Sequence, residues 1–563
     1  MVSPVQLSQI TKLRSLGWKQ RDIAERLGLS QQVIAYQLKK LHERAEVEGA
    51  DSVLAEFSSP EFEKKIRLNE LCSWLWEGAN ILRGPVEHAD FKTYLFPLLF
   101  LKRINDVWEE ERQAAIKEVG ADFPENHRFH IPKGARWSDI RSAGRDVGQV
   151  LQKSMRDIES SNLNLEGIFG DAQWTNKERF TDERLKDIIE HFSKHKLGRD
   201  VSDDDLVGQA YEWTIKKFAD IENKAAGEFY TPRSVIRLMI QIIKPQEGQS
   251  IYDPACGTGG MLLEAVRYIR ERDGDIRSLY GNLFGQEKNL ITSSMARANL
   301  FLHSLEDFTI ARGDTLLEPA FIEGGALQKF DVVIANPPFS LKNWGHAHWS
   351  NDRWGRNAYG MPPAKNGDYA WIEHMIASMK KNGRMAVVLP KGALYRMGAE
   401  GKIRKKLLEN DLVECIIGLA PNLFYGTGLA ASIMILNNKK SILKKGKLLV
   451  IDSSEQFWKG RAQNEMREEH VSRILELYEA FDDVEGESKV VDMAELQEND
   501  WNLNIPRYVL PVLAEDSVTL DEAITNLKES LKAVSHAEKH LKEILGQSGL
   551  LEDFGHLLVG DSQ

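Results

Sequence analysis

The residues with the clearest chemical meaning are Asn336-Pro337-Pro338-Phe339, directly after the apolar run 331–335. The Asn336 carboxamide oxygen and the Pro337 carbonyl are acceptors that can bind one exocyclic amino group together. Two prolines hold the backbone extended, and Phe339 offers an aromatic face on which a base can stack. Two acceptors favour a pyramidal amine and stabilise the positive charge that develops as a methyl group arrives. The pattern predicts catalytic roles for all four residues in methylating N6 of an adenine that is flipped out of the duplex.

A glycine-rich turn lies earlier in the chain, between an expected strand and a helix that begins near Met261. Its sequence is Asp253-Pro254-Ala255-Cys256-Gly257-Thr258-Gly259-Gly260. Glycine lets the backbone approach a ligand closely, and a helix N-terminus favours negative groups. Proteins that bind NAD, flavin or S-adenosylmethionine all use such a turn, so it does not by itself choose the cofactor. The turn has no lysine, which excludes a P-loop. The strand ends in Asp-Pro, which resembles the first motif of adenine-N6 methyltransferases.

Two acidic residues follow the glycine-rich turn at intervals that suit a nucleoside-like cofactor. Glu287 closes the next expected strand, 283–287, where a carboxylate can accept from both hydroxyls of a ribose. Asp314 then lies where a carboxylate can accept from the amino group of the cofactor's adenine. Each acid alone would be explained as a loop or cap residue. Their order after the glycine-rich turn favours cofactor binding.

A further segment, Gly227-Glu228-Phe229-Tyr230-Thr231-Pro232-Arg233, precedes the first expected strand. Its residue types predict a turn before a helix, with Thr231 as the cap and Pro232 as the first helical residue. Together with the glycine-rich turn and Asn-Pro-Pro-Phe, it resembles the methylation (M) subunit of type I restriction–modification systems, a family of N6-adenine DNA methyltransferases. The resemblance extends over about residues 62–548.

This resemblance implies a fold, a cofactor and partners. The fold is α/β, a class I S-adenosyl-L-methionine-dependent (Rossmann-like) methyltransferase sheet with an all-α N-terminal domain and C-terminal helices. The residues implied to bind S-adenosyl-L-methionine are Glu228, Phe229, Tyr230, Thr231, Pro232, Asp253, Gly257, Thr258, Gly259, Glu287 and Asp314. The partners are double-stranded DNA, a specificity (S) subunit that reads the DNA site for two M subunits, and a restriction (R) subunit. The alternatives are a stand-alone adenine methyltransferase and a helix-turn-helix scaffold protein with a silent methyltransferase domain.

The elements that must position these residues follow from the pattern of apolar runs. Short runs at 249–253, 283–287, 330–335, 385–389, 412–418 and 447–451 predict buried strands that alternate with helices. This alternation is typical of an open, mainly parallel α/β sheet. Residues 61–222 show helical periodicity, and the eight-residue block 94–101 is too short to cross a membrane and predicts a buried helix. We expect a helical domain over 61–222 and a methyltransferase domain over 223–510.

Both ends of the chain are expected to be helical. Residues 1–48 resemble a helix-turn-helix, with the small Ala24 at the crossing and Ser30 capping a second helix. That helix bears side chains that suit DNA, namely Gln31, Gln32, Tyr36, Lys39 and Lys40. A protein-docking module is an equal alternative. Residues 515–548 predict an amphipathic helix pair in a C-terminal region, 511–563, that contacts the specificity subunit; a self-packed hairpin is the alternative.

The composition excludes several other classes of protein. The chain has 563 residues and a formal charge of −11, so a basic partner or a locally basic surface must supply most phosphate contacts. It has no secretory signal and three scattered cysteines, which together predict a cytoplasmic protein. No Pro-Cys step is present for cytosine methylation, and Cys256 is expected to be a small buried thiol. No metal site is expected. The aromatic loop 344–356 predicts either a lid that faces DNA, which is favoured, or a lid over the cofactor.

Overall fold

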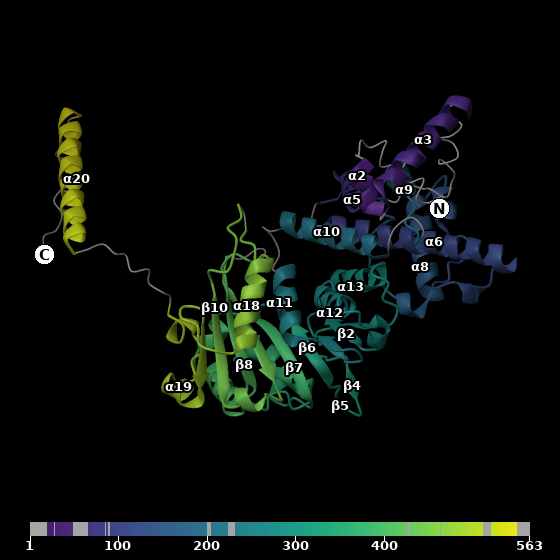
Figure 1. The fold of residues 1–563 in the computed structure, drawn as a ribbon. Helices are drawn as coiled ribbons and strands as arrows, with labels where there is room; N and C mark the ends of the chain where they lie inside the picture. Colours follow the sequence, from purple (N-terminus) through teal and green to yellow (C-terminus); the bar gives the residue numbers. More distant parts are fainter. Residues whose placement is uncertain are drawn as a thin grey trace.

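The structure is a computed structural model that describes residues 20–27, 29–48, 66–84, 86–87, 90–199, 204–222, 231–424, 428–461, 463–510 and 520–548. A helical N-terminal domain stands beside a large sheet, and a separate helix lies near the C-terminus (Figure 1). Among the described residues, those predicted to act in catalysis and cofactor binding lie in the strands of this sheet or next to them.

The N-terminal part contains helices only, apart from turns and short 3-10 segments, among the residues described. The helices are α2 (Gln20–Leu27), α3 (Gln31–Glu48), α5 (Leu68–Ile81), α6 (Phe91–Val119), α7 (Trp137–Arg141), α8 (Val147–Ser161), α9 (Asp182–Ser193) and α10 (Asp204–Glu222). The apolar block 94–101 is entirely buried within α6, which confirms the prediction of a buried helix. None of the helices that the structure describes is long and apolar enough to cross a membrane.

The sheet has nine strands in the order β11-β10-β8-β9-β7-β6-β1-β2-β3. The strands are β1 (Ile251–Asp253), β2 (Leu283–Glu287), β3 (Thr309–Arg312), β6 (Phe330–Ala335), β7 (Met379–Pro390), β8 (Val413–Leu419), β9 (Ala431–Asn437), β10 (Lys447–Ser453) and β11 (Ser488–Asp492). Neighbours are parallel except that β9 runs antiparallel to β7 and β8, and β11 to β10. A small hairpin, β4 (Ile322–Glu323) and β5 (Ala326–Leu327), stands outside the sheet. The mainly parallel α/β prediction is confirmed.

The six expected strands are present, and three further strands of the large sheet were not predicted. β3 has only four residues, none of them buried, at an edge of the sheet, so it lacks an apolar run. β9 is apolar and almost entirely buried, so its apolar run was an available signal, whereas its antiparallel insertion between β7 and β8 depends on tertiary pairing. β11 adds the opposite edge by pairing with β10.

Helices cover both faces of the sheet and create two cores. These helices are α11 (Arg233–Ile243), α12 (Gly260–Arg270), α13 (Leu290–Leu302), α14 (His346–Trp349), α15 (Asp368–Ala377), α16 (Gly392–Tyr395), α17 (Ala399–Glu409), α18 (Glu468–Ala480) and α19 (Met493–Glu498). Helices α11, α12 and α18 pack with one face of the sheet, and α15, α17 and α19 pack with the other. Alternate buried side chains of each strand serve the two cores, as period-two geometry requires.

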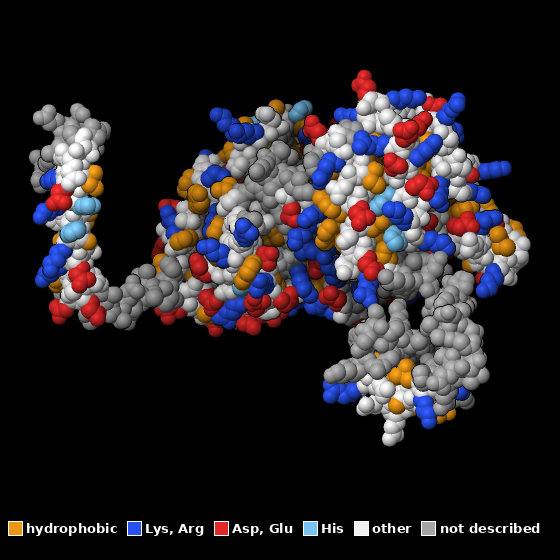
Figure 2. Space-filling model, turned by 90° about the horizontal axis from the view of Figure 1, so that it is seen from above, with side chains coloured by type: hydrophobic (Ala, Val, Ile, Leu, Met, Phe, Trp, Pro, Cys, Tyr) orange, Lys and Arg blue, Asp and Glu red, His pale blue; other side chains and the backbone are white. Residues whose placement is uncertain are grey.

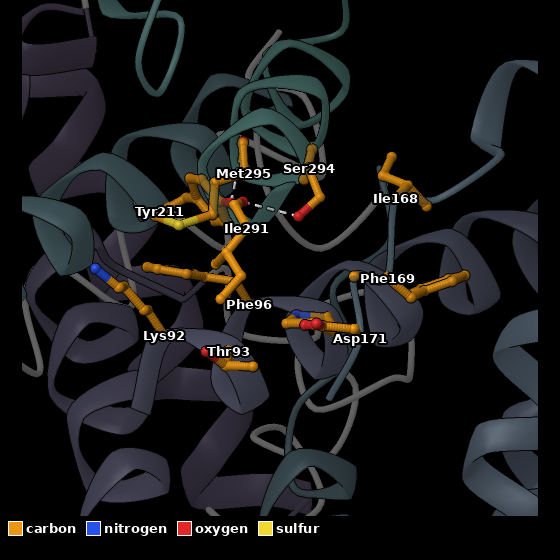
Figure 3. A pocket seen from close by; sticks show the side chains of 13 residues that line it. Lys92, Thr93, Phe96, Ile168, Phe169, Asp171, Tyr211, Ile291, Ser294 and Met295 are labelled. Carbon is orange, nitrogen blue, oxygen red and sulfur yellow. Dashed lines mark hydrogen bonds between the residues drawn. The ribbon is translucent and has the colours of Figure 1, made fainter. Parts of the chain in front are cut away.

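Helix α13 joins the sheet to the helical domain. Met295 and Phe301 of α13 belong to the core of the helical domain, whereas Leu300 belongs to the sheet's core. The Tyr211 hydroxyl of α10 donates to the Met295 carbonyl over 3.1 Å. Figure 3 shows the narrow pocket at this junction, where Phe96 of α6 faces the α13 side chains. Most of the pocket's lining is apolar, with Lys92 and Asp171 among the polar residues, and none of its lining residues lies at the strand ends described below.

The C-terminal region contains one described helix, α20 (Leu520–Gln547). The predicted pair of helices over 515–548 is therefore wrong, and a self-packed hairpin is excluded. The physical reason is that no proline and no glycine before Gly546 interrupts this stretch, so one helix continues through it. In Figure 1, α20 stands apart from the remainder of the described chain.

Candidate functional site

The predicted site lies at the carboxyl ends of three adjacent strands. β1 pairs with β2 on one side and with β6 on the other, all parallel. The glycine-rich turn follows β1, Glu287 ends β2, and Asn336 follows β6. The chain leaves β1 toward β2 and later returns to β6 on the opposite side. Open α/β sheets bind ligands at such a switch in strand order.

The glycine-rich turn has the backbone that the sequence predicted. Gly257 and Gly259 have φ values of +53° and +81°, which favour glycine, and a Cβ on Gly257 would meet no atom within 4 Å. The turn is joined to the next strand because the Gly257 amide donates to Glu287 Oε2 over 3.1 Å. The Thr258 carbonyl accepts from Asn299 of α13 over 2.9 Å. The structure thus brings these predicted cofactor residues together across a βα unit.

Two side chains beneath the turn are buried. Cys256 is 5 % exposed, which confirms the prediction of a buried thiol, and burial raises its pKa. It packs against Gly285 of β2, where an added Cβ would lie 2.9 Å from the Cys256 Sγ. Asp253 is 2 % exposed and accepts from the Ala255 amide over 3.0 Å. Burial raises the pKa of Asp253 to about 8, and the nearby Glu287 carboxylate adds to the rise.

Asp314 lies in a turn after β3, with its carboxylate partly engaged. Its Oδ1 accepts from the amides of Leu316 and Leu317 over 3.1 and 3.2 Å, so it organises the turn. Its Oδ2 is 2.9 Å from the ammonium of Lys288, which follows β2 directly. Lys288 was not predicted from the sequence, because nothing but its place next to Glu287 marks it.

Asn336 is held by a residue from the segment that precedes α11. Its Nδ2 donates to Thr231 Oγ1 over 2.7 Å. This fixes the carboxamide so that Oδ1 points elsewhere, and Oδ1 is buried with no described donor within reach. A buried acceptor without a partner costs about 1–3 kcal/mol. Such an atom is therefore a candidate for contact with a ligand.

The same contact corrects a local prediction. Thr231 does not cap the following helix: Pro232 occupies the N-cap position of α11, without a side-chain cap bond, and Thr231 faces Asn336 instead. The predicted residues Glu228, Phe229 and Tyr230 lie outside the described residues. Thr231, at the described end of this segment, nevertheless contacts Asn336 of the Asn-Pro-Pro-Phe segment.

The remainder of the Asn-Pro-Pro-Phe segment is packed against the sheet's core. Pro337 is buried, and Pro338 and Phe339 are half-buried. The Phe339 ring lies edge-to-face with Phe424, with centroids 6.1 Å apart. Phe424 follows β8 and was not singled out from the sequence as an aromatic partner.

Two further side chains hold the backbone that follows Phe339. Asp368 Oδ1, at the start of α15, accepts from the Ser340 amide over 2.7 Å. Arg396 forms an ion pair with Asp368 and another with Glu400. Asp368 was not predicted from the sequence. The signal available was a carboxylate placed at a helix start after Gly367.

Part of the aromatic loop 344–356 is buried, namely Trp344, Trp349 and Arg356, so these side chains do not form the exposed surface that the favoured prediction of a DNA-facing lid would use. Trp349 is fully buried, and its Nε1 donates to the Leu316 carbonyl over 2.9 Å. Arg356 is 2 % exposed, pairs with Asp352 at 2.7 Å and lies 4.2 Å above the Trp349 ring. Its guanidinium also donates to the Leu316 carbonyl over 2.9 Å. Trp349 is therefore buried as an anchor of the turn that begins at Asp314, whereas His348 and Arg353 are exposed and Trp354 is half-buried.

The fold defines the class of the protein as a class I methyltransferase. The strand order matches that class, and an Asn-Pro-Pro-Phe segment lies one strand from the glycine-rich turn.

Comparison with known proteins specifies the family. The family model described as N-6 DNA Methylase matches residues 202–517, and that of the HsdM N-terminal domain matches residues 71–192. The type I restriction enzyme MjaVII methylase subunit of Methanocaldococcus jannaschii is 34 % identical over 424 residues, which cover 73 % of this chain and 70 % of that protein. The HindI methylase subunit of Haemophilus influenzae is 29 % identical, covering 78 % and 98 %.

Solved structures agree with these sequence comparisons. The type I restriction-modification methyltransferase subunit from Streptococcus thermophilus has a TM-score of 0.69 at 29 % identity, and the match covers 79 % of this chain and 100 % of that chain. The chain belongs to the N-6 DNA methylase family, among the methylase subunits of type I restriction enzymes. Its activity is adenine-specific methylation of DNA.

Proposed function

We propose that this chain transfers the methyl group of S-adenosyl-L-methionine to N6 of an adenine flipped out of duplex DNA, at a site read by a separate specificity subunit. The observation that carries the proposal is the buried Oδ1 of Asn336, which has no hydrogen-bond donor among the described residues and lies at the end of β6, one strand from the glycine-rich turn. An acceptor held in this way suits an incoming amino group.

The residues along β1, β2 and β3 fit the proposed cofactor. Gly257 leaves open space where a side chain would otherwise stand, and the N-terminus of α12 lies behind it. Glu287 and Asp314 offer carboxylates suited to ribose hydroxyls and to an adenine amine. Asp253, Thr258, Gly259, Thr231 and Pro232 complete the described part of this set. S-adenosyl-L-methionine supplies an electrophilic methyl group on a sulfonium.

The task of the chain's own residues is to make the target amine reactive and to hold it in line. The two N–H groups of N6 donate hydrogen bonds to Asn336 Oδ1 and to the Pro337 carbonyl. This arrangement favours a pyramidal nitrogen whose lone pair is available. The same acceptors stabilise the positive charge that develops on that nitrogen. Phe339 supports the extruded base by stacking, and Phe424 holds the Phe339 ring from one edge.

The test uses the chain with its specificity subunit, labelled S-adenosyl-L-methionine and DNA that contains the site. Asn336→Ala is expected to lower methyl transfer by about 100-fold or more while cofactor affinity changes little, since one preorganised electrostatic contact is worth about that much. Asn410→Ala, at an exposed asparagine, is the matched control. No transfer by the parent complex would favour a silent scaffold. Transfer without the specificity subunit would favour a stand-alone enzyme.

Helix α20 is the proposed contact with the specificity subunit, within the region 511–563. Its apolar residues Ile524, Leu527, Leu531, Val534 and Leu541 are 40–60 % exposed. Their spacing alternates between three and four residues up to Val534, and Leu541 follows one heptad later, so they form a coiled-coil seam. Among the described residues of α20, only Leu545 has a partly buried side chain. An exposed seam of this kind suits a long helix of another subunit.

Co-purification with the specificity subunit tests this contact. Leu527→Asp/Leu531→Asp places two charges in the seam and is expected to abolish co-purification while cofactor binding remains. Glu529→Ala/His536→Ala changes exposed residues outside the seam and is expected to have no effect. Retention of the specificity subunit by the Asp variant would place the contact elsewhere.

A further inference from the structure

The helix-turn-helix-like segment has no task in the function proposed above, and its described part is a packed unit. Three residues separate α2 from α3, and Ile23, Ala24 and Ile34 are buried between the two helices. The Leu29 amide donates to the Ala24 carbonyl over 3.0 Å, which shapes the turn. The Ser30 hydroxyl accepts from the Val33 amide over 3.3 Å and caps α3, as predicted.

One face of α3 points away from this small core. At 100° per residue, Gln32, Tyr36, Lys39 and Lys40 share one side of the helix, opposite Ile34. Tyr36 is 64 % exposed, and Gln32, Lys39 and Lys40 are exposed as well. This outward face carries amide, hydroxyl and ammonium groups. These groups surround the exposed ring of Tyr36, and the two lysines of this face, a residue type depleted in protein interfaces, favour an anionic partner.

Charge singles out the same segment. Residues 1–48 contain eight Lys and Arg against five Asp and Glu, a net charge of +3. Because the whole chain carries −11, the remaining residues carry −14. The described side chains of the unit, at 20, 21, 23, 24 and 29–40, include three cations and no carboxylate. Figure 2 shows lysine and arginine side chains on the projection that the unit forms. The segment is thus a basic module on an acidic protein.

We propose that α3 binds duplex DNA as a recognition helix in the major groove, a contact separate from the Asn336 pocket. Gln31 and Gln32 stand at the helix N-terminus, where such helices reach base edges, and glutamine can pair with adenine there. Lys39 and Lys40 contact phosphates farther along the helix. The methylase subunit would then hold DNA itself, beside the contacts made by its specificity partner.

Salt-dependent binding of the full chain to a labelled duplex of about 30 base pairs, without cofactor, tests the proposal. Each phosphate contact contributes about 0.9 to the slope of log affinity against log salt, so Lys39→Ala/Lys40→Ala should lower that slope by about 1.8. We expect the same variant to bind at least fivefold more weakly at about 100 mM salt. Lys117→Ala/Lys133→Ala removes two exposed lysines from the helical domain and should leave the slope unchanged. An unchanged slope in the α3 variant overturns the proposal.

A second variant and a second readout separate DNA from a protein partner. Gln31→Ala/Gln32→Ala retains both lysines and should keep the salt slope while abolishing any preference among duplex sequences in competition. The lysine variant is also tested for co-purification with the specificity subunit. If it loses that subunit while the affinity for DNA stays at the parent value, α3 is a protein-docking helix and the proposal is wrong.

Discussion

The hydrogen bond between Asn336 Nδ2 and Thr231 Oγ1 gives the sharpest prediction about catalysis. Thr231→Val keeps the shape of the side chain and removes the acceptor, so the Asn336 amide nitrogen loses its partner. Leaving one buried polar group unsatisfied costs about 1–3 kcal/mol. If that cost falls on the orientation of Oδ1 in the transition state, kcat should drop by about 5- to 150-fold. Thr231→Ser keeps the hydroxyl and is expected to retain most activity.

Single-turnover methyl transfer by the complex with its specificity subunit, together with calorimetry of cofactor binding, measures this effect. A residue that only contacts the cofactor would change cofactor affinity and leave the rate at saturation intact. The reasoning is refuted if Thr231→Val transfers methyl groups at the parent rate, or if Thr231→Ser is equally impaired. A double-mutant cycle sharpens the test, because Thr231→Val should add nothing to Asn336→Ala.

Three further predictions concern the frame of the site. Burial raises the pKa of Asp253 from 3.8 to about 8, so this carboxyl stays protonated in the folded chain while it ionises in the unfolded chain. The free energy of unfolding should therefore fall by about 1.4 kcal/mol per pH unit between about pH 4 and pH 8. Urea unfolding of Asp253→Asn should lack this pH dependence. Arg356→Met breaks a buried ion pair and should cost about 3–5 kcal/mol in urea unfolding, whereas Arg277→Met, on the surface, should cost under about 1 kcal/mol. Gly285→Ala should weaken cofactor binding measurably by calorimetry because its Cβ would displace the glycine-rich turn, whereas Gly144→Ala, which meets no atom within 4 Å, should not. Parent-like behaviour of any of these three variants would contradict the corresponding packing argument.

Much of the sheet was predictable because a buried strand needs a short apolar run wherever it is placed. Strands β2 and β6 have the bounds that their apolar runs predicted. The glycine-rich turn was predictable for the same kind of reason, since positive φ values at Gly257 and Gly259 demand glycine locally. These features depend on residues close together in the chain.

The aromatic loop shows where a local pattern was insufficient, and the C-terminal helix shows where a second local signal, the absence of a break, was needed beside periodicity. The interleaved tryptophans and arginines favoured a nucleic-acid surface, and only the tertiary structure showed that Trp349 and Arg356 are buried against Leu316. Likewise, periodicity alone did not separate one long helix from two. The course of α20 follows from the absence of a break in its sequence.

The amino-acid sequence by itself determined which groups are available and predicted their chemistry: an amide and a carbonyl acceptor after a strand, a glycine-rich turn, and acids in the order that suits a nucleoside-like cofactor. Only the tertiary structure decided which groups support them. Thr231 holds Asn336 from 105 residues away, Glu287 binds Gly257 from 30 residues away, and Asp368 holds Ser340 from 28 residues away. Such contacts leave no local mark, because a hydrogen bond between distant segments depends on where the folded sheet brings their backbones together.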